Sequence, residues 1–341
     1  MLSYRPSSSK LFLAIAFALV LLSVSASAKQ VEDKSSPCTV AIPVTVTVSD
    51  GRAVTPLTSA AFEARVHGRP ASITTLDQDE TPKRIVLVLD ASRKVNAEAW
   101  RMETSLASFL ANGVPSRVSL ALVVLNAETP TLDFTTPRET LKSVLADLAS
   151  IRPTNAKEGE NIYEALVSDL RLFGTRQFGD AMFAFLGGSD DSGRIDAGEV
   201  RRRFIEQGVR VFGFVLGQRA LSGFYKVKPG GSGPAEIPWD PDTDEIGGFA
   251  SGTGGLLAVE NTRMPSVTYH LSDERLKQLQ TTAYRLYTHI VTPYRIQISV
   301  NALAKPENLS IELSKATQTQ VPTARILFPR QLIPCAAVSA R

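Results

Sequence analysis

The chain has 341 residues, of which 43% are hydrophobic and 21% are charged, and its formal net charge is +3. This composition excludes a disordered chain, a collagen-like chain and a coiled coil, and the length suits two domains or one large α/β domain with an appendage. The near balance of charge implies no general attraction to nucleic acid or to an acidic membrane, so we expect no nucleic-acid partner.

The first 28 residues have the three parts of a secretory signal peptide. Arg5 and Lys10 precede an apolar run over 11–24, and small residues at 26–28 offer a cleavage site. The run is too short for a comfortable membrane span, although an uncleaved N-terminal anchor is the alternative. We therefore predict a signal peptide over 1–28, a protein that is secreted or periplasmic, and no membrane span in the mature chain.

The only cysteines, Cys38 and Cys335, lie near the two ends of the mature chain. In an oxidising compartment such a pair is most simply a disulfide bond, which would tie the N-terminal segment to the C-terminal one. Two buried free thiols are the alternative.

Both ends of the mature chain have the period-two pattern of half-buried strands. In 38–80 valine alternates with threonine, and further alternating runs follow between turns. In 291–335 the alternation returns over 294–300, 309–313 and 324–328. We predict that the two segments together build one β-sandwich.

The middle of the chain, 83–290, alternates apolar runs with segments of helical spacing. The apolar runs are typical of strands buried on both faces and cover 84–90, 118–125, 181–186, 209–216 and 254–259. The expected helices cover 97–110, 137–150, 161–173, 196–207, 245–251 and 266–289. This alternation predicts a doubly wound, mostly parallel α/β sheet, inserted into the β-sandwich. The segment 217–244 interrupts this alternation of strands and helices and is predicted to be a loop insertion.

The first strand of the expected parallel sheet ends in groups that could hold a cation. Ligands bind beyond the carboxyl ends of strands in open α/β sheets. Asp90 ends the strand and Ser92 follows, and a carboxylate and a hydroxyl at this spacing suit Mg²⁺ or Ca²⁺. Alternatively, Asp90 is held by Lys94 or by loop N–H groups, and Ser92 is a capping or turn residue.

The segments RIVLVLDAS, GENIYEAL and AMFAFLGGSDDSG, in this order, resemble the von Willebrand factor A (VWA) domain. The stretches VTVTVSDGRAVTPLTSAAF and VHGRP are similar to the leader of a family of secreted bacterial proteins, abundant in acidobacteria, described as VWFA-related. The resemblance covers nearly all of the mature chain. It implies a VWA/Rossmann-like sheet and a metal-ion-dependent adhesion site (MIDAS). That site combines DxSxS after the first strand, a Thr before a helix and an Asp after a later strand.

The first part of this motif is incomplete in the chain. Asp90 and Ser92 stand at the first two positions of DxSxS, but Lys94 stands at the third, where it brings a positive charge and no ligand. Lys94 would oppose a divalent cation or replace it by pairing with Asp90.

The other two parts of the motif also depart from the family's pattern. The Thr position falls on Glu160, and the Asp position falls on Gly188, with Asp190 and Asp191 further along the same loop. Glu160 and Asp190 are oxygen donors that could join Asp90 and Ser92 around Mg²⁺ or Ca²⁺. The resemblance thus implies a degenerate MIDAS.

We therefore expect an exported, non-enzymatic adhesion module without a small-molecule cofactor. It would bind another protein of the cell envelope or the extracellular space through the carboxyl end of the sheet, without a metal. The residues expected around that face are Asp90, Ser92, Lys94, Glu160, Asp190 and Asp191. Alternatives are an envelope hydrolase that uses the acidic loops and a structural subunit of an envelope assembly. The aromatic residues of the 217–244 insertion either anchor a partner or fold back onto the domain.

Overall fold

The computed structural model describes residues 38–333 apart from 49–50, 93–94, 130, 151–161, 187–196, 217–244, 261–270, 302 and 304. All described residues belong to one compact unit that begins at Pro37. The predicted signal peptide and the predicted loop insertion lie outside the described residues, and both stay predictions. Within the described ranges, no helix is long and apolar enough to cross a membrane.

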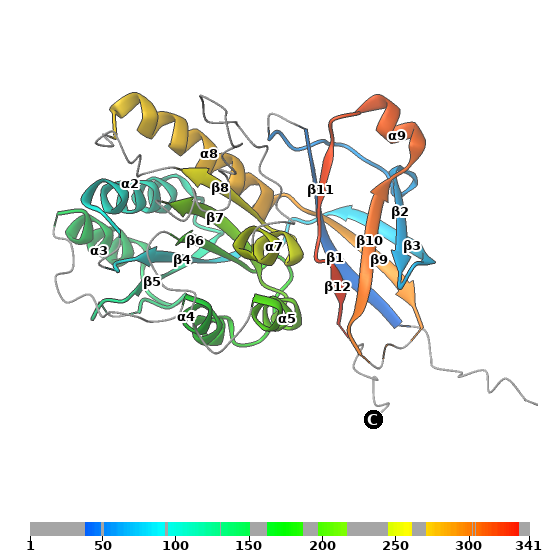
Figure 1. Cartoon of the computed structure of the whole chain (residues 1–341), viewed down its shortest axis with the longest axis horizontal. Helices are drawn as coiled ribbons and strands as arrows, with labels where there is room; N and C mark the ends of the chain where they lie inside the picture. The colour runs from blue at the N-terminus through cyan, green and yellow to red at the C-terminus, as the bar shows by residue number, and fades with distance from the viewer. Residues whose placement is uncertain are drawn as a thin grey trace, which may run out of the picture. The chain divides into compact units, whose positions relative to one another are not determined.

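A parallel sheet of five strands forms the centre of the α/β part (Figure 1). Its strands, in spatial order, are β5 (Ser119–Leu125), β4 (Arg84–Asp90), β6 (Ala181–Leu186), β7 (Arg210–Leu216) and β8 (Leu256–Glu260). Successive side chains of β4 point to opposite faces of the sheet and pack into two separate hydrophobic cores. Leu87 and Leu89 lie on one face, and Val86 and Val88 lie on the other. Both faces of the sheet are therefore buried, as the continuous apolar runs predict.

Helices cover both faces of this sheet (Figure 1). One face carries α2 (Ala97–Gly113), α3 (Arg138–Ser150) and α8 (Asp273–Val291). The other carries α4 (Ile162–Asp169), which continues into η2 (Leu170–Phe173), together with α5 (Ala197–Gln207) and α7 (Glu245–Gly252). The two helical layers confirm the doubly wound α/β fold class that the sequence pattern and the VWA resemblance imply.

Helix α8 begins later than the sequence pattern predicts. The expected helix starts at 266, whereas α8 starts at Asp273. The side chain of Ser272 accepts a hydrogen bond of 3.1 Å from the backbone N–H of Arg275, which is the geometry of an N-cap. A serine cap thus sets the start of the helix.

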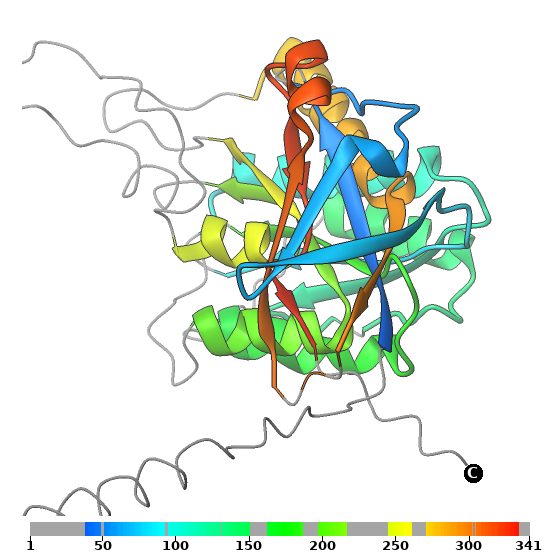
Figure 2. The ribbon, with the colours of Figure 1, turned by 90° about the vertical axis from the view of Figure 1, so that its right-hand side faces the viewer.

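An antiparallel sheet of seven strands combines both ends of the chain (Figures 1 and 2). In spatial order they are β11 (Arg325–Leu327), β1 (Cys38–Thr47), β9 (Tyr294–Val300), β3 (Arg69–Gln78), β2 (Phe62–Val66), β10 (Glu307–Leu313) and β12 (Gln331–Leu332). The short helices η1 (Ser59–Ala61) and α9 (Lys315–Gln320) precede β2 and follow β10. The expectation that both chain ends build one β unit is confirmed.

The antiparallel strands form one curled sheet around a single core, where the sequence predicts the two sheets of a sandwich. The register between β3 and β9 shifts between Ile73 and Thr75. Such a bulge increases the local twist and bends a sheet, so a continuous sheet can enclose its own core. Cys38 is the first residue of β1, but Cys335 lies outside the described residues, so the disulfide bond stays a prediction.

The two sheets meet at the C-terminal end of α8. Arg210, the first residue of β7, donates from Nη1 and Nη2 to the carbonyl oxygens of His289 and Ile290, over 3.3 and 2.9 Å. From the antiparallel sheet, the hydroxyl of Thr45 donates to the carbonyl oxygen of His289, over 3.2 Å. The last turn of α8 therefore connects the parallel sheet with β1.

Candidate functional site

The strand order places a topological switch point between β4 and β6. The two strands are neighbours in the sheet, but the helix that follows β4 packs on one face and the helix that follows β6 packs on the other. A crevice forms at the carboxyl ends of such strands, and ligands of open α/β sheets bind there. Asp90 ends β4, and the 187–196 segment with its two aspartates follows β6.

Asp90 is fully buried, and its carboxylate organises the turn that leaves β4. Its Oδ1 accepts a hydrogen bond of 2.9 Å from the backbone N–H of Ser92 and one of 3.2 Å from Nδ2 of Asn126. A carboxylate that accepts from the N–H two residues ahead makes an Asx turn. Asp90 thus holds the loop after β4 to the residue that follows β5.

Asn126 has a backbone conformation that few residue types adopt without cost. Its φ of 59° is left-handed, a region in which Asn is enriched because its side chain forms local hydrogen bonds. The residue follows β5 directly, and its side chain is buried against Asp90. The only sequence signal for its role is a polar residue directly after a buried strand.

Glu103 is a second fully buried carboxylate beside the same turn. It projects from α2, and its Oε2 accepts a hydrogen bond of 2.8 Å from the backbone N–H of Asp90. An acceptor at this place satisfies a donor at the end of a buried strand, which would otherwise be costly to bury. Sequence analysis missed Glu103, although it lies on the apolar stripe of α2 that includes Ala99, Leu106 and Leu110.

The structure brings Asp90 and Ser92 together and describes no other residue of the predicted set. Both are buried, and the backbone of Ser92 contacts the carboxylate of Asp90. The remaining predicted residues lie outside the described part of the chain: Lys94, Glu160, Asp190 and Asp191. The degenerate MIDAS and the acidic loops of the hydrolase alternative therefore stay predictions.

The described acidic side chains around the turn do not form a cluster of metal ligands. Mg²⁺ takes six ligands and Ca²⁺ six to eight, most of them oxygen atoms of carboxylates, carbonyls and water. Among the described residues, no group of three or more His, Cys, Asp or Glu side chains could hold a metal ion. The carboxylate of Asp90 accepts from two N–H donors, and that of Glu103 accepts from the backbone of β4. In the described part of the chain these two carboxylates thus organise the turn, and the other predicted ligands lie outside that part.

No protein-family model matches the chain, and no curated protein matches it in sequence. Solved structures with a similar fold include BatB from Bacteroides thetaiotaomicron, which is 19% identical with a TM-score of 0.41 over 60% of this chain and 98% of that one. Proximal thread matrix protein 1 from the mussel byssus, described with a zinc-occupied MIDAS motif, is 16% identical with a TM-score of 0.41, over 62% of this chain and 49% of that one.

Manganese-loaded TRAP from Plasmodium vivax is 9% identical, with a TM-score of 0.38 over 74% of this chain and 95% of that one. The identities and TM-scores of these similarities are too low to carry an argument about function. The fold class stands on the sheet order and the helical layers of the chain itself.

Proposed function

We propose that the protein is an exported, non-enzymatic interaction module of the cell envelope or the extracellular space. It binds another protein through the carboxyl end of the parallel sheet, at the switch point between β4 and β6. The observation that carries this proposal is the turn held by Asp90, which fixes the start of the loop after β4 at that place. A loop anchored to a rigid sheet suits recognition, because little ordering is needed on binding.

In this proposal Asp90 and Ser92 position the loop and do not contact the partner themselves. Both are buried, so they hold the loop in shape while neighbouring residues meet the partner. Glu128, which is exposed two residues after Asn126, lies on the same side of the sheet. The connections that follow β6, β7 and β8 start at this edge too, and the sequence of the 217–244 segment contains aromatic residues of the kind enriched at protein interfaces.

Recognition by this face is metal-independent in the proposal. The described carboxylates near the turn accept hydrogen bonds from N–H groups. Lys94 stands in the sequence where the MIDAS motif requires a third ligand. A cationic side chain at that position disfavours a divalent cation by charge repulsion.

Site-specific photo-crosslinking in the producing cell tests the proposal. A photoreactive residue at Glu128 lies at the carboxyl end of the sheet, and one at exposed Thr175, before β6, lies at the amino end as the matched control. We expect an adduct of one defined mass from position 128 and none from position 175, unchanged by a chelator. An adduct from position 175 alone, or equally from both, would show that the proposed face is wrong. Loss with the chelator and recovery with Mg²⁺ would show that a metal takes part.

A further inference from the structure

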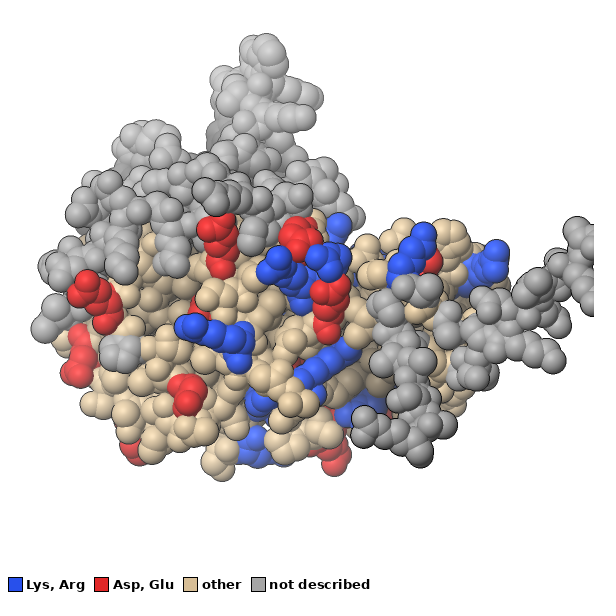
Figure 3. Space-filling model, turned by 90° about the horizontal axis from the view of Figure 1, so that it is seen from below, with Lys and Arg blue, Asp and Glu red and all other residues tan. Residues whose placement is uncertain are grey.

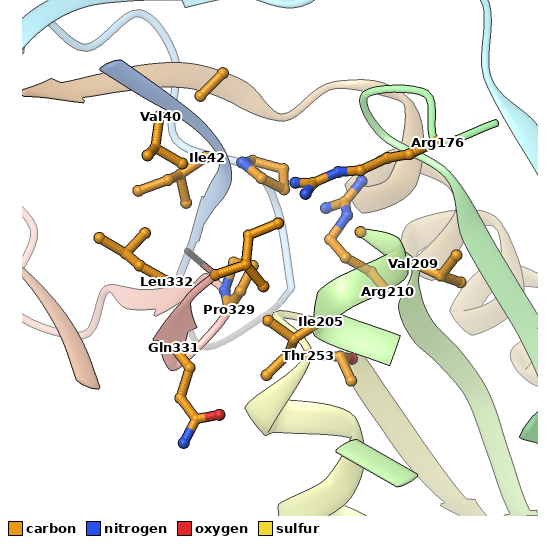
Figure 4. A pocket seen from close by; sticks show the side chains of 14 residues that line it. Val40, Ile42, Arg176, Ile205, Val209, Arg210, Thr253, Pro329, Gln331 and Leu332 are labelled. Carbon is orange, nitrogen blue, oxygen red and sulfur yellow. The ribbon is translucent and has the colours of Figure 1, made fainter. Parts of the chain in front are cut away.

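A small pocket lies between β1 and the α5–β7 edge, at the amino end of the parallel sheet (Figure 4). Its cavity volume is about 30 Å³. One water molecule needs roughly 10–15 Å³ on this measure, so the pocket suits a small ion better than an organic molecule. Arg176 and Arg210 enter it from the α/β side, and Val40, Ile42 and Pro43 of β1 form the opposite wall.

Arg210 brings a buried positive charge to this pocket. Its side chain is 1% exposed, and Nη1 and Nη2 donate to backbone carbonyl groups of α8. Its Nε has no hydrogen-bond acceptor among the described residues, and no ion pair within that part of the chain includes Arg210. A buried charge without an ion pair is costly, because the carbonyl groups, the Phe212 ring 5.2 Å from Cζ and the charge of Asp79 replace only part of the lost hydration.

Arg176 supplies a second guanidinium group, at the mouth of the pocket. It is exposed and lies across Gly208, where a Cβ atom would come within 2.3 Å of its Nε. The nearby carboxylate of Asp180 accepts from Nε and Nη2 of Arg84, over 2.9 and 2.6 Å, and from a backbone N–H. In the described ranges Arg176 therefore has neither an ion pair nor a hydrogen bond of its own.

Two further arginines lie close to the residues that line the pocket. On the face that Figure 3 shows, Lys and Arg side chains gather over the middle, with several Asp and Glu side chains among them. Arg201 lies across Gly252, where a Cβ atom would come within 2.2 Å of its Cδ, and the backbone N–H of exposed Arg330 donates to the carbonyl oxygen of Gly252. The acids of α5 pair with arginines of the same helix: Glu199 with Arg202 and Arg203, and Glu206 with Arg202.

Burial lowers the pKa of both arginines in the pocket. The pKa of Arg210 falls to about 10, with partial compensation from Asp79, and the pKa of Arg176 is lowered with partial compensation from Asp180. Arg210 thus carries a charge that has lost most of its hydration, whereas exposed Arg176 has lost only part of its own. An anion between them would stabilise both charged forms.

We propose that this pocket binds a small inorganic anion of the size of chloride, held between Arg176 and Arg210. Guanidinium groups are weakly hydrated and present several N–H donors, which suits them to anions at partly buried places. The anion would take the Nε donor of Arg210 and give Arg176 a partner. Because β1 forms the opposite wall, occupancy would also strengthen the contact between the two sheets.

Thermal unfolding of the full chain tests the proposal, with sodium chloride exchanged for sodium gluconate at constant ionic strength. At an anion concentration of a hundred times Kd, the midpoint of a protein of this size should rise by about 5 °C. We expect a saturable rise in the native chain, its loss in Arg176→Gln, and its retention in Arg171→Gln. Arg171 is an exposed arginine of η2 with no ion pair among the described residues, so Arg171→Gln controls for the loss of one charge.

Three results would overturn the proposal. An equal rise in the native chain and in Arg176→Gln would show a general salt effect. A rise with phosphate but none with chloride would exclude an occupant of halide size. Crystals soaked in bromide locate the ion independently, and anomalous density between the two guanidinium groups is expected. Its absence there, at concentrations that saturate the thermal shift, would also contradict the site.

Discussion

Arg210 at the start of β7 and Ile290 in the last turn of α8 are joined by a hydrogen bond of 2.9 Å from Nη2 to the carbonyl oxygen. The last carbonyl groups of a helix have no partner within the helix and carry partial negative charge. A buried guanidinium therefore matches them in donors and in charge. Because α8 leads directly into β9, this contact holds the end of the α/β part to the strand that follows.

Replacing Arg210 with methionine should destabilise the protein by about 2–4 kcal/mol. The variant removes two hydrogen bonds from a charged donor and leaves buried carbonyl oxygens of α8 without that partner. Urea unfolding measures the loss. Arg171→Met, which removes an exposed arginine, is the control and should change the free energy of unfolding by less than about 0.5 kcal/mol. Equal midpoints for the two variants would contradict the capping role of Arg210.

Glu103 should tolerate glutamine better than alanine. Gln keeps an oxygen that can accept from the backbone N–H of Asp90, whereas Ala leaves that buried donor unsatisfied and opens a cavity. We expect Glu103→Ala to cost about 2–4 kcal/mol and Glu103→Gln to cost less than half as much. Chemical unfolding of the two variants side by side decides the point. If Gln costs as much as Ala, the hydrogen bond to Asp90 is not what Glu103 contributes.

Two substitutions of Asn126 distinguish the cost of its left-handed backbone conformation from the contribution of its side-chain hydrogen bond. Asn126→Gly loses the hydrogen bond to Asp90 but adopts φ of 59° easily, and Asn126→Ala loses both advantages. The alanine variant should therefore be less stable than the glycine variant by about 1 kcal/mol. A glycine variant no more stable than the alanine variant would show that the left-handed conformation costs nothing here.

His289 should make stability fall as the pH is lowered. Burial, together with nearby Arg210 and Arg285, lowers its pKa from 6.5 to about 4. Between these values the unfolded chain binds the proton and the folded chain does not, so the free energy of unfolding decreases toward acid by up to about 3 kcal/mol. Above the unfolded pKa the residue contributes no pH dependence. Urea unfolding at about pH 7 and about pH 5 measures the slope, which should be shallower in His289→Gln. An unchanged slope in that variant would contradict a buried neutral imidazole.

The predicted bond between Cys38 and Cys335 should make stability sensitive to reducing agents. A loop of roughly 300 residues gives a disulfide at most about 5 kcal/mol on the chain-entropy account. Mass spectrometry after alkylation under denaturing conditions should find no free thiol before reduction and two after it. The Cys38→Ser, Cys335→Ser double variant should unfold at the same midpoint with and without reductant. Alkylation of both thiols in the unreduced protein would exclude the bond.

Most of the fold could be predicted from the sequence because two different periods mark its two parts. Runs such as 181–186 are apolar at every position, since helices cover both faces of the parallel sheet, and β6 has these bounds. The alternation over 294–300 matches β9, which is buried on one face. The single curled sheet was not predictable, because its bulge depends on how β3 pairs with β9, far away in the sequence.

Of the candidate site, only the residues at the end of a predicted strand could be identified from the sequence. Asp90 and Ser92 were found because they end an apolar run. Glu103 was missed because an acid within a helix is usually solvated, and only the packing of α2 shows that this one is buried. Asn126 was missed because its role depends on the parallel pairing of β4 with β5, which places it beside Asp90.

The pairing of β1 has a consequence for the order of events during synthesis. Its two neighbours in the sheet are β9 and β11, so apart from the local contacts of its last residues with 52–54 the strand has no partner until roughly 250 further residues have been made. At about 5–20 residues per second this interval lasts on the order of 10–50 s. Throughout that time most of an apolar strand has open edges exposed to other nascent chains, which is the situation that favours aggregation. Chaperones that hold nascent or translocating chains would therefore matter most for this protein before β9 has been made.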